Sequence, residues 1–131
     1  MEGPEKIARE VIQGVAEKVI GCAFAVQNTL GVGFVEKVYE NALAHEVRKA
    51  GLKVEQQKPI HVIYDGVNVG NYECDLLVEG CVVVELKVVR AFDDVHMAQC
   101  MNYLKATGHR LCLLINFAAP RVDVRRIVMN L

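Results

Sequence analysis

The stretch from Asn71 to Lys87, which reads Asn-Tyr-Glu-Cys-Asp-Leu-Leu-Val-Glu-Gly-Cys-Val-Val-Val-Glu-Leu-Lys, decides how this chain folds. Two apolar runs flank Glu79-Gly80, which suits a turn, so the stretch predicts a β-hairpin. Side chains alternate faces along a strand, so Glu85 and Lys87 at the end of the second run point the same way. Charges on so apolar a strand need a partner or a metal ion, because burying an unpaired charge is costly.

The length of the hairpin loop decides whether Asp75 joins these charges. A two-residue loop pairs Val78 with Cys81, and Asp75 then points away from Glu85. A three-residue loop pairs Val78 with Val82 and brings the two acids opposite one another. We expect an odd loop or a bulge, because a slip of one residue turns every side chain to the other face. The alternative is an edge hairpin whose acids are solvated.

The chain has 131 residues, 53% hydrophobic and 24% charged, a balance that suits one globular domain over residues 1–131. It contains no run of eighteen or more apolar residues, so we expect no membrane span. Its five cysteines form no Cys-x-x-Cys pair, which argues against a zinc knot or a disulfide framework. Because the N-terminus also lacks a signal-type apolar core, we expect a cytoplasmic protein.

Charge is distributed unevenly along the chain, although the net charge is only −1. Residues 85–131 carry seven Lys or Arg against four Asp or Glu, a net of +3, and residues 1–84 carry eight against twelve, a net of −4. A near-neutral chain disfavours a large sequence-independent nucleic-acid footprint, but a modest basic face can still meet phosphates. The candidates for that face are Arg90, Lys105, Arg125 and Arg126.

Two helices are predicted before the first strand. Apolar residues recur with a helical period over 7–26, after Pro4, a residue that suits a helix start. Gly14 and Gly21 weaken that period, so we expect one kinked helix or two shorter ones. The second helix is expected over about 34–50, because a glycine follows at the position where helices commonly end.

Three acids of the second predicted helix lie close to its buried face. At about 100° per residue, the apolar stripe consists of Val35, Val38, Tyr39, Ala42, Leu43, Val47 and Ala50. Glu36 and Glu40 lie on the margin of this stripe, one turn apart, and Glu46 lies nearer its centre. The alternative for each acid is a rim or capping carboxylate.

Strands and one further helix follow. A strand over 54–64, in which Pro59 indicates an edge or bulge position, is joined by Asp65-Gly66 to a strand over 67–78. A helix over 95–107, capped by Asp93 or Asp94 and ended by Gly108, places His96, Gln99 and Tyr103 on one face. The remaining strands cover about 81–89, 111–117 and 122–129. This order predicts an α/β fold.

The residues that carry chemistry favour one kind of site. The chain has no phosphate-binding Gly-x-x-x-x-Gly-Lys run and no Gly-x-Ser-x-Gly turn, and its four histidines are scattered. The remaining set is Glu36, Asp75, Glu85, Lys87, Gln99 and Tyr103. Carboxylate oxygens suit Mg²⁺ or Mn²⁺, and such an ion can activate water and neutralise a phosphodiester. A nearby lysine can orient the water and offset charge that develops in the transition state.

These motifs resemble a known family. Asp75, followed ten residues later by Glu85-Leu86-Lys87, resembles the Asp…Glu-x-Lys signature of the PD-(D/E)XK nuclease superfamily. Residues 99–103 resemble the Gln-x-x-x-Tyr motif of its RecB-like branch, and residues 33–39 are similar to the motif that names the GxxExxY proteins. The resemblance covers about residues 12–129. Cys74 precedes Asp75, where the superfamily name has proline.

The resemblance implies a restriction-endonuclease-like α/β fold, in which helices flank a central mixed β-sheet. It implies that Asp75, Glu85 and the Leu86 carbonyl bind the metal, and that Glu36 or Glu40 completes the site. It further implies that Lys87 acts beside the water. Gln99 and Tyr103 would hold the lysine or the substrate.

Two interpretations of function remain at the level of sequence. The first is a nuclease that uses Mg²⁺ or Mn²⁺ to hydrolyse phosphodiester bonds in DNA, and the complete acid–acid–lysine set favours it. The second is a catalytically silent nucleic-acid-binding or protein-assembly module on the same fold, which the near-neutral charge favours. A homodimer would help so small a module span a duplex. A small-molecule hydrolase lacks a recognisable nucleophile in this chain.

Overall fold

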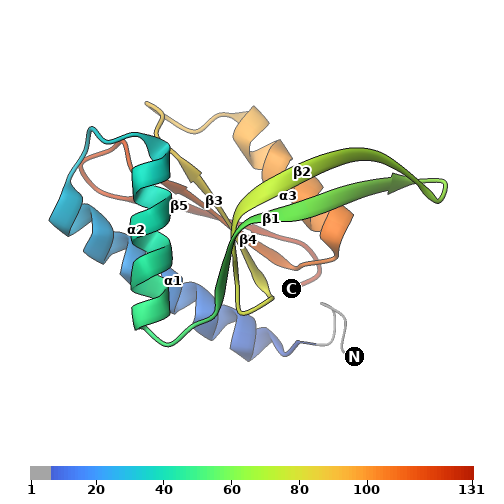
Figure 1. Cartoon of the computed structure of the whole chain (residues 1–131), viewed down its shortest axis with the longest axis horizontal. Coiled ribbons are helices and arrows are strands. Elements are labelled where there is room, and N and C mark those ends of the chain that lie inside the picture. The colour runs from blue at the N-terminus through green and yellow to red at the C-terminus, as the bar shows by residue number, and fades with distance from the viewer. Residues whose placement is uncertain (1–6) are drawn as a thin grey trace.

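The computed structural model describes residues 7–131 and contains three helices and five strands within that range. Two helices precede a meander of three strands, and a third helix leads into the last two strands (Figure 1). In chain order the elements are α1 (Arg9–Leu30), α2 (Glu36–Lys49), β1 (Val54–Tyr64), β2 (Val67–Val78), β3 (Val82–Lys87), α3 (Asp94–Thr107), β4 (Leu111–Asn116) and β5 (Asp123–Val128).

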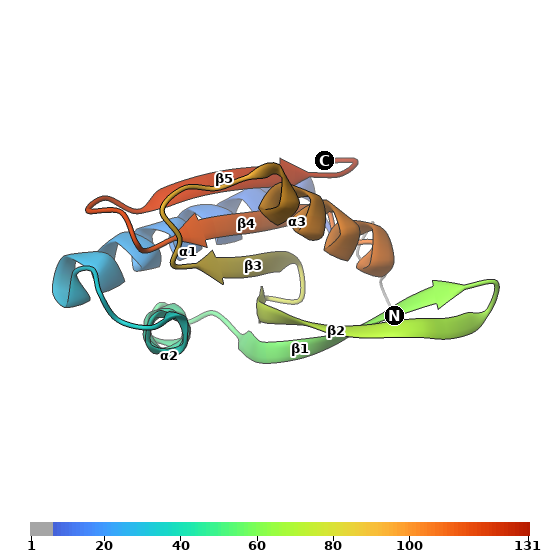
Figure 2. The ribbon, with the colours of Figure 1, turned by 90° about the horizontal axis from the view of Figure 1, so that it is seen from above.

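The five strands form one mixed sheet in the order β1-β2-β3-β4-β5. Strands β3 and β4 are parallel and joined through α3, whereas the other neighbouring strands are antiparallel. Helix α3 covers one face of the sheet, and α1 covers the other (Figure 2). This is the mixed sheet flanked by helices that the sequence predicts, with a buried parallel pair at its centre.

The first helix is one element, so the alternative of two shorter helices is wrong. Helix α1 runs without interruption through Gly14 and Gly21, where an added Cβ would meet nothing within 4 Å. The predicted start at Pro4 lies outside the described residues, and the described helix begins at Arg9. Within residues 7–131, no helix combines the length and apolar character needed to cross a bilayer.

The buried face of α2 is rotated from the predicted stripe. Val35 and Val38 are 69% and 36% exposed, whereas Glu40, expected outside the stripe, is only 3% exposed. Packing of α2 against α1 and the sheet selects Tyr39, Glu40, Leu43, Ala44 and Val47 as its buried face. The rotation turns an acid inward, so the helix presents a carboxylate beneath the sheet edge.

The β2–β3 connection has the odd loop that the sequence predicts. Val78 pairs with Val82, so three residues form the loop, with Glu79 and Gly80 at φ values of 52° and 63°. The Asp65-Gly66 hairpin is also confirmed, with both residues at positive φ as a two-residue turn requires. The predicted ends of the later strands are one or two residues too long, since β3 ends at Lys87 and β4 at Asn116.

The outer part of β1 and β2 forms a two-stranded arm. Strand β2 pairs with β3 only through Leu76, Leu77 and Val78, so the strand segments beyond these pairs extend past the sheet (Figure 1). In the inner part, Leu76 and Val78 belong to the core beneath α1 and α2. In the outer part, Cys74 and Ile60 belong to the core beneath α3. The inward side chains of β2 therefore change from the α3 side of the sheet at Cys74 to the α1 side at Leu76.

Candidate functional site

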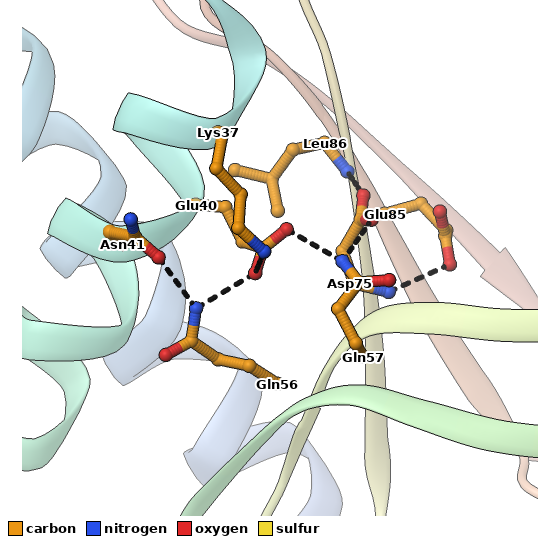
Figure 3. A network of polar contacts seen from close by, with 8 residues as sticks. All are labelled: Lys37, Glu40, Asn41, Gln56, Gln57, Asp75, Glu85 and Leu86. Carbon is orange, nitrogen blue, oxygen red and sulfur yellow. Dashed lines mark hydrogen bonds and ion pairs between the residues drawn. The ribbon is translucent and has the colours of Figure 1, made fainter.

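Asp75 and Glu85 lie side by side where the β2–β3 ladder ends. The backbone N–H of Asp75 donates to Oε1 of Glu85 at 3.3 Å, and the backbone N–H of Leu86 donates to Oδ2 of Asp75 at 2.8 Å (Figure 3). These two bonds continue the pairing beyond the last ladder pair, Leu76 and Val84. Side-chain oxygens thus take the place of backbone acceptors, and both carboxylates are fixed at one point.

The Glu85 carboxylate is nearly inaccessible to water. Its residue is 4% exposed, and burial, then the neighbouring Asp75, raises the pKa of Glu85 from 4.5 to about 9. Lys87 acts in the opposite direction and lowers this pKa. Burial and a like charge both disfavour the ionised form, so this site would gain free energy from a bound cation.

Lys87 ends β3 beside this pair. Its charge lowers the pKa of Glu36 as well as that of Glu85, so the lysine lies near both the helix acid and the strand acid. The backbone of Lys87 is held on the β4 side, because its carbonyl accepts from the Phe117 N–H at 3.0 Å. The effect of Lys87 on the pKa of Glu85 agrees with two side chains on one face of a strand.

Both helix acids from the prediction lie near the strand acids. Glu40 accepts hydrogen bonds from Lys37, Gln56 and Gln57 at 2.9, 2.7 and 2.7 Å (Figure 3). Glu36 lies one turn earlier and is exposed, and its pKa is raised by partial burial and then by Asp75. Glu40 is thus the buried, hydrogen-bonded acid and Glu36 the solvent-facing one. Glu46, the third helix acid, pairs instead with Lys49 at 3.5 Å.

The residues before Glu36 form a loop that sets where α2 begins. Gly33 adopts φ 109°, a conformation that favours glycine. Tyr39 is fully buried, its hydroxyl donates to the Gly31 carbonyl at 2.5 Å, and its ring stacks on Phe117 with centroids 4.8 Å apart. The glycine and tyrosine that bracket Glu36 are therefore structural, and they hold the start of the helix against the sheet.

Gln99 and Tyr103 lie on α3 over the same end of the sheet. The Gln99 amide donates to the Tyr103 hydroxyl at 2.9 Å. Burial, and then Glu85, raises the pKa of Tyr103, which places the phenol near the acid. His96, which shares their face, takes a different role, because it forms a capping box with Asp93 at the helix start.

The structure adds residues that sequence reasoning missed. Gln57 donates to Asp75 Oδ1 at 3.2 Å as well as to Glu40, so it touches acids from two elements. Asn116 is 2% exposed and brackets Val89, donating to its carbonyl at 2.7 Å and accepting from its N–H at 3.2 Å. Two features of the sequence could have indicated these residues. One is the pair of consecutive glutamines in a predicted strand, and the other is the asparagine at the end of an apolar strand.

The donor chemistry of the site suits a hard divalent cation. Asp75 and Glu85 lie together, and the raised pKa of Glu85 reflects burial and then repulsion by Asp75, both of which a cation would offset. Within residues 7–131, however, no three or more His, Cys, Asp or Glu side chains are arranged to hold a metal ion. The set fits Mg²⁺ or Mn²⁺ by chemistry, and the roles of the Leu86 carbonyl and of Glu36 or Glu40 stay predictions.

The four predicted nucleic-acid-binding residues do not share one face. All are exposed, but Arg125 and Arg126 are consecutive on β5 and point to opposite sides of the sheet. Arg125 pairs with Asp123 at 2.7 Å and lies 5.6 Å from the Phe92 ring centroid, on the α3 side. Arg126 is therefore on the side of α1, away from α3. Arg90 and Lys105 follow β3 and lie on α3, respectively.

Comparisons with solved structures agree with this fold. The crystal structure of SSO0001 matches with a TM-score of 0.54 and 16% identity, over 72% of this chain and 50% of that one. The alkaline exonuclease LHK-Exo from Laribacter hongkongensis matches with a TM-score of 0.53 and 16% identity, over 94% of this chain and 71% of that one. This chain thus spans about half the length of SSO0001. At such identity the likeness shows the fold alone.

Comparison of the sequence with protein-family models identifies the superfamily of the chain. None of the curated proteins compared with this chain matches it significantly. The family model of the PD-(D/E)XK nuclease superfamily matches residues 13–127, a range that includes both helix acids, the strand acids, the lysine and the Gln99–Tyr103 pair. This match covers most of the 131 residues. The chain belongs to the PD-(D/E)XK nuclease superfamily.

Proposed function

We propose that this chain is a divalent-metal-dependent nuclease that hydrolyses phosphodiester bonds in DNA. The observation that supports it most directly is the contact between Asp75 and Glu85, two acids that meet where the β2–β3 ladder ends, beside Lys87. A buried acid beside a second, half-buried acid is unfavourable to folding unless a cation is bound, so this arrangement points to a task other than stability.

Each residue has a separate task in this proposal. Asp75 and Glu85 would hold Mg²⁺ or Mn²⁺, which supplies activation of water and neutralisation of phosphate charge. Lys87 would orient the attacking water and stabilise negative charge on the phosphate oxygens in the transition state. Tyr103, held by Gln99, would limit access of bulk water to Glu85 from the α3 side. Glu36 faces solvent and could accept the proton of the water.

Finer assignments belong to the same proposal. The Gly33–Tyr39 segment supports placement among the GxxExxY proteins, since its glycine and tyrosine have structural tasks around Glu36. The Gln99–Tyr103 contact supports the RecB-like branch. The name of LHK-Exo describes an exonuclease, and that likeness, together with the family, favours a nucleic-acid substrate here. Assembly as a homodimer stays a proposal from the small size of the chain.

A catalytically silent binding or assembly module is the second candidate. Protein groups satisfy the carboxylates of Glu40 and Asp75, since the first accepts from Lys37, Gln56 and Gln57 and the second from Gln57 and Leu86. A site whose acids are all used internally can persist for structural reasons. This module would retain the nucleic-acid or protein contacts of the fold and lack turnover.

Cleavage assays separate the two candidates. The parent protein is incubated with labelled single- and double-stranded DNA and RNA, with Mg²⁺, with Mn²⁺ and with a chelator. We expect cleavage of DNA that requires metal and is abolished by Glu85→Ala. Glu73→Ala, which removes an exposed acid from the same hairpin, serves as the matched control and should cleave as the parent does. A parent that binds metal but cleaves no substrate would favour the silent module.

A further inference from the structure

Gln57 occupies an unusual backbone conformation within a strand. Its φ is 52°, in the left-handed region that residues with a Cβ rarely adopt, although it lies inside β1. The ladder skips this residue, because Gln56 pairs with Leu76 and Lys58 pairs with Cys74, with no pair between them. Conformations of this kind cost free energy and persist where the surrounding structure requires them.

The bend at Gln57 changes which side chains share a face. Consecutive residues of a regular strand point in opposite directions. Here the amides of Gln56 and Gln57 both donate to Glu40, to Oε2 and Oε1 respectively, each at 2.7 Å (Figure 3). The left-handed residue therefore brings two neighbours of one strand to one carboxylate. The face exchange of β2 between Cys74 and Leu76 occurs opposite the same point.

The second hydrogen of the Gln57 amide reaches the strand acid. Nε2 lies 2.7 Å from Glu40 Oε1 and 3.2 Å from Asp75 Oδ1 (Figure 3). A primary amide carries two N–H donors, so it can bind two ionised carboxylates at once without supplying a proton. Asp75 Oδ2 accepts from the Leu86 N–H, so both oxygens of Asp75 have a defined direction.

We propose that Gln57 is a positioning residue that joins Glu40 of α2 to Asp75 of β2 and so holds both carboxylates ready for a divalent cation. The inference rests on the proposed function and extends it, because it selects Glu40 as the helix acid coupled to Asp75. The amide touches the acids rather than the substrate, so its effect passes through their orientation. The left-handed backbone of Gln57 goes with an amide that lies within hydrogen-bond reach of both acids.

Replacement of Gln57 by glycine separates this role from a structural one. Glycine adopts positive φ without strain, which offsets the loss of the two hydrogen bonds of the amide, so Gln57→Gly should unfold close to the temperature of the parent. The same variant should lose about tenfold or more in affinity for Mn²⁺, as removal of groups that orient metal ligands commonly does. Isothermal titration with Mn²⁺ alone measures the affinity, and thermal unfolding measures the stability.

A matched control isolates the backbone contribution. Asp65 also has φ 52° but lies in the β1–β2 turn at the end of the arm. Asp65→Gly should raise the unfolding temperature and leave the Mn²⁺ affinity at the parent value. Parent-like Mn²⁺ affinity and cleavage in Gln57→Gly would overturn the positioning role and leave the nuclease proposal standing. If Gln57→Gly has reduced Mn²⁺ affinity and the parent cleaves no substrate, the nuclease proposal is overturned and the positioning role of Gln57 stands.

A second measurement does not depend on metal. The shifts in unfolding temperature caused by Glu40→Gln and Asp75→Asn are measured singly and together, in the parent and in the Gln57→Gly background. If the amide joins the two acids, the shifts are non-additive in the parent and become additive once the amide is removed. Equal coupling in both backgrounds would show that Gln57 does not connect Glu40 to Asp75.

Discussion

The backbone N–H of Asp75 and the Oε1 atom of Glu85, 3.3 Å apart, join two acids from neighbouring strands at the point where their ladder ends. The pair exists because the β2–β3 loop has three residues, which brings positions 75 and 85 opposite one another. It lies beside Lys87 and is approached by α2 from one side and α3 from the other.

The pH dependence of stability should report Glu85. Its folded pKa is about 9 against 4.5 for an ordinary glutamate. Below pH 4.5 both states are protonated; between the two pKa values only the unfolded state releases the proton, so stability falls as pH rises. Glu85→Gln keeps the acceptor for the Asp75 N–H and removes this loss. The variant should be more stable than the parent at pH 7 by on the order of 2 kcal/mol.

Urea unfolding at pH values between 5 and 9 measures this difference. Glu73→Gln, an exposed acid in the same hairpin, should follow the parent throughout. If the free energy of unfolding changes with pH by the same slope in the parent and in Glu85→Gln, the raised pKa of Glu85 is contradicted. Addition of Mg²⁺ should reduce the slope of the parent, because a bound cation favours the ionised carboxylate.

Lys87→Ala should lower the rate of cleavage and leave the affinity for metal largely unchanged. Without the ammonium group, charge that develops on the phosphate in the transition state is unopposed, so kcat should fall on the order of 10²-fold or more. Mn²⁺ affinity should change little, because the acids remain. Single-turnover cleavage and titration with Mn²⁺ provide the two values, and Lys18→Ala on the exposed side of α1 is the control. A large loss of Mn²⁺ affinity in Lys87→Ala would show that the lysine holds the metal site together rather than stabilising the transition state.

The two consecutive arginines of β5 should differ in their effect on nucleic-acid binding. Arg125 lies on the α3 side, which is the side of Glu85 and Tyr103, and Arg126 lies on the opposite side. Arg125→Ala should therefore weaken binding and reduce the slope of log Kobs against log[salt] by about 1, whereas Arg126→Ala should not. Fluorescence anisotropy at several salt concentrations tests this. Equal effects of both variants would mean that the nucleic acid contacts the sheet edge.

The Tyr39 hydroxyl should stabilise the loop before α2. Tyr39→Phe removes its bond to the Gly31 carbonyl while retaining the ring that stacks on Phe117. The free energy of unfolding should fall by about 1 kcal/mol, because a partly buried carbonyl loses its donor. Tyr64→Phe at a 73% exposed position is the control and should be neutral. A neutral Tyr39→Phe would show that stacking alone holds the loop.

Local pattern predicted the elements well where one physical rule dominated. The Asp65-Gly66 turn, the Asp93 cap and the Gly108 end of α3 depend on backbone conformation and short-range hydrogen bonds, and all three are confirmed. Helix α1 is not divided in two, because packing of Ala16, Val19 and Ala23 in the core outweighs the helix propensity lost at two glycines. The same competition rotated α2 and buried Glu40.

The sequence by itself determined the site acids of β2 and β3. Strand period and loop parity place Asp75, Glu85 and Lys87 together, since the geometry of a hairpin follows from residue count. Only the tertiary structure decided the contribution of the helix, because the angle at which α2 packs chooses between Glu36 and Glu40 as the buried acid. It also revealed Gln57, which lies between two acids because its backbone has a left-handed bend. The contacts of Gln57 with Glu40 and Asp75 are non-local, and a local sequence pattern does not encode such contacts.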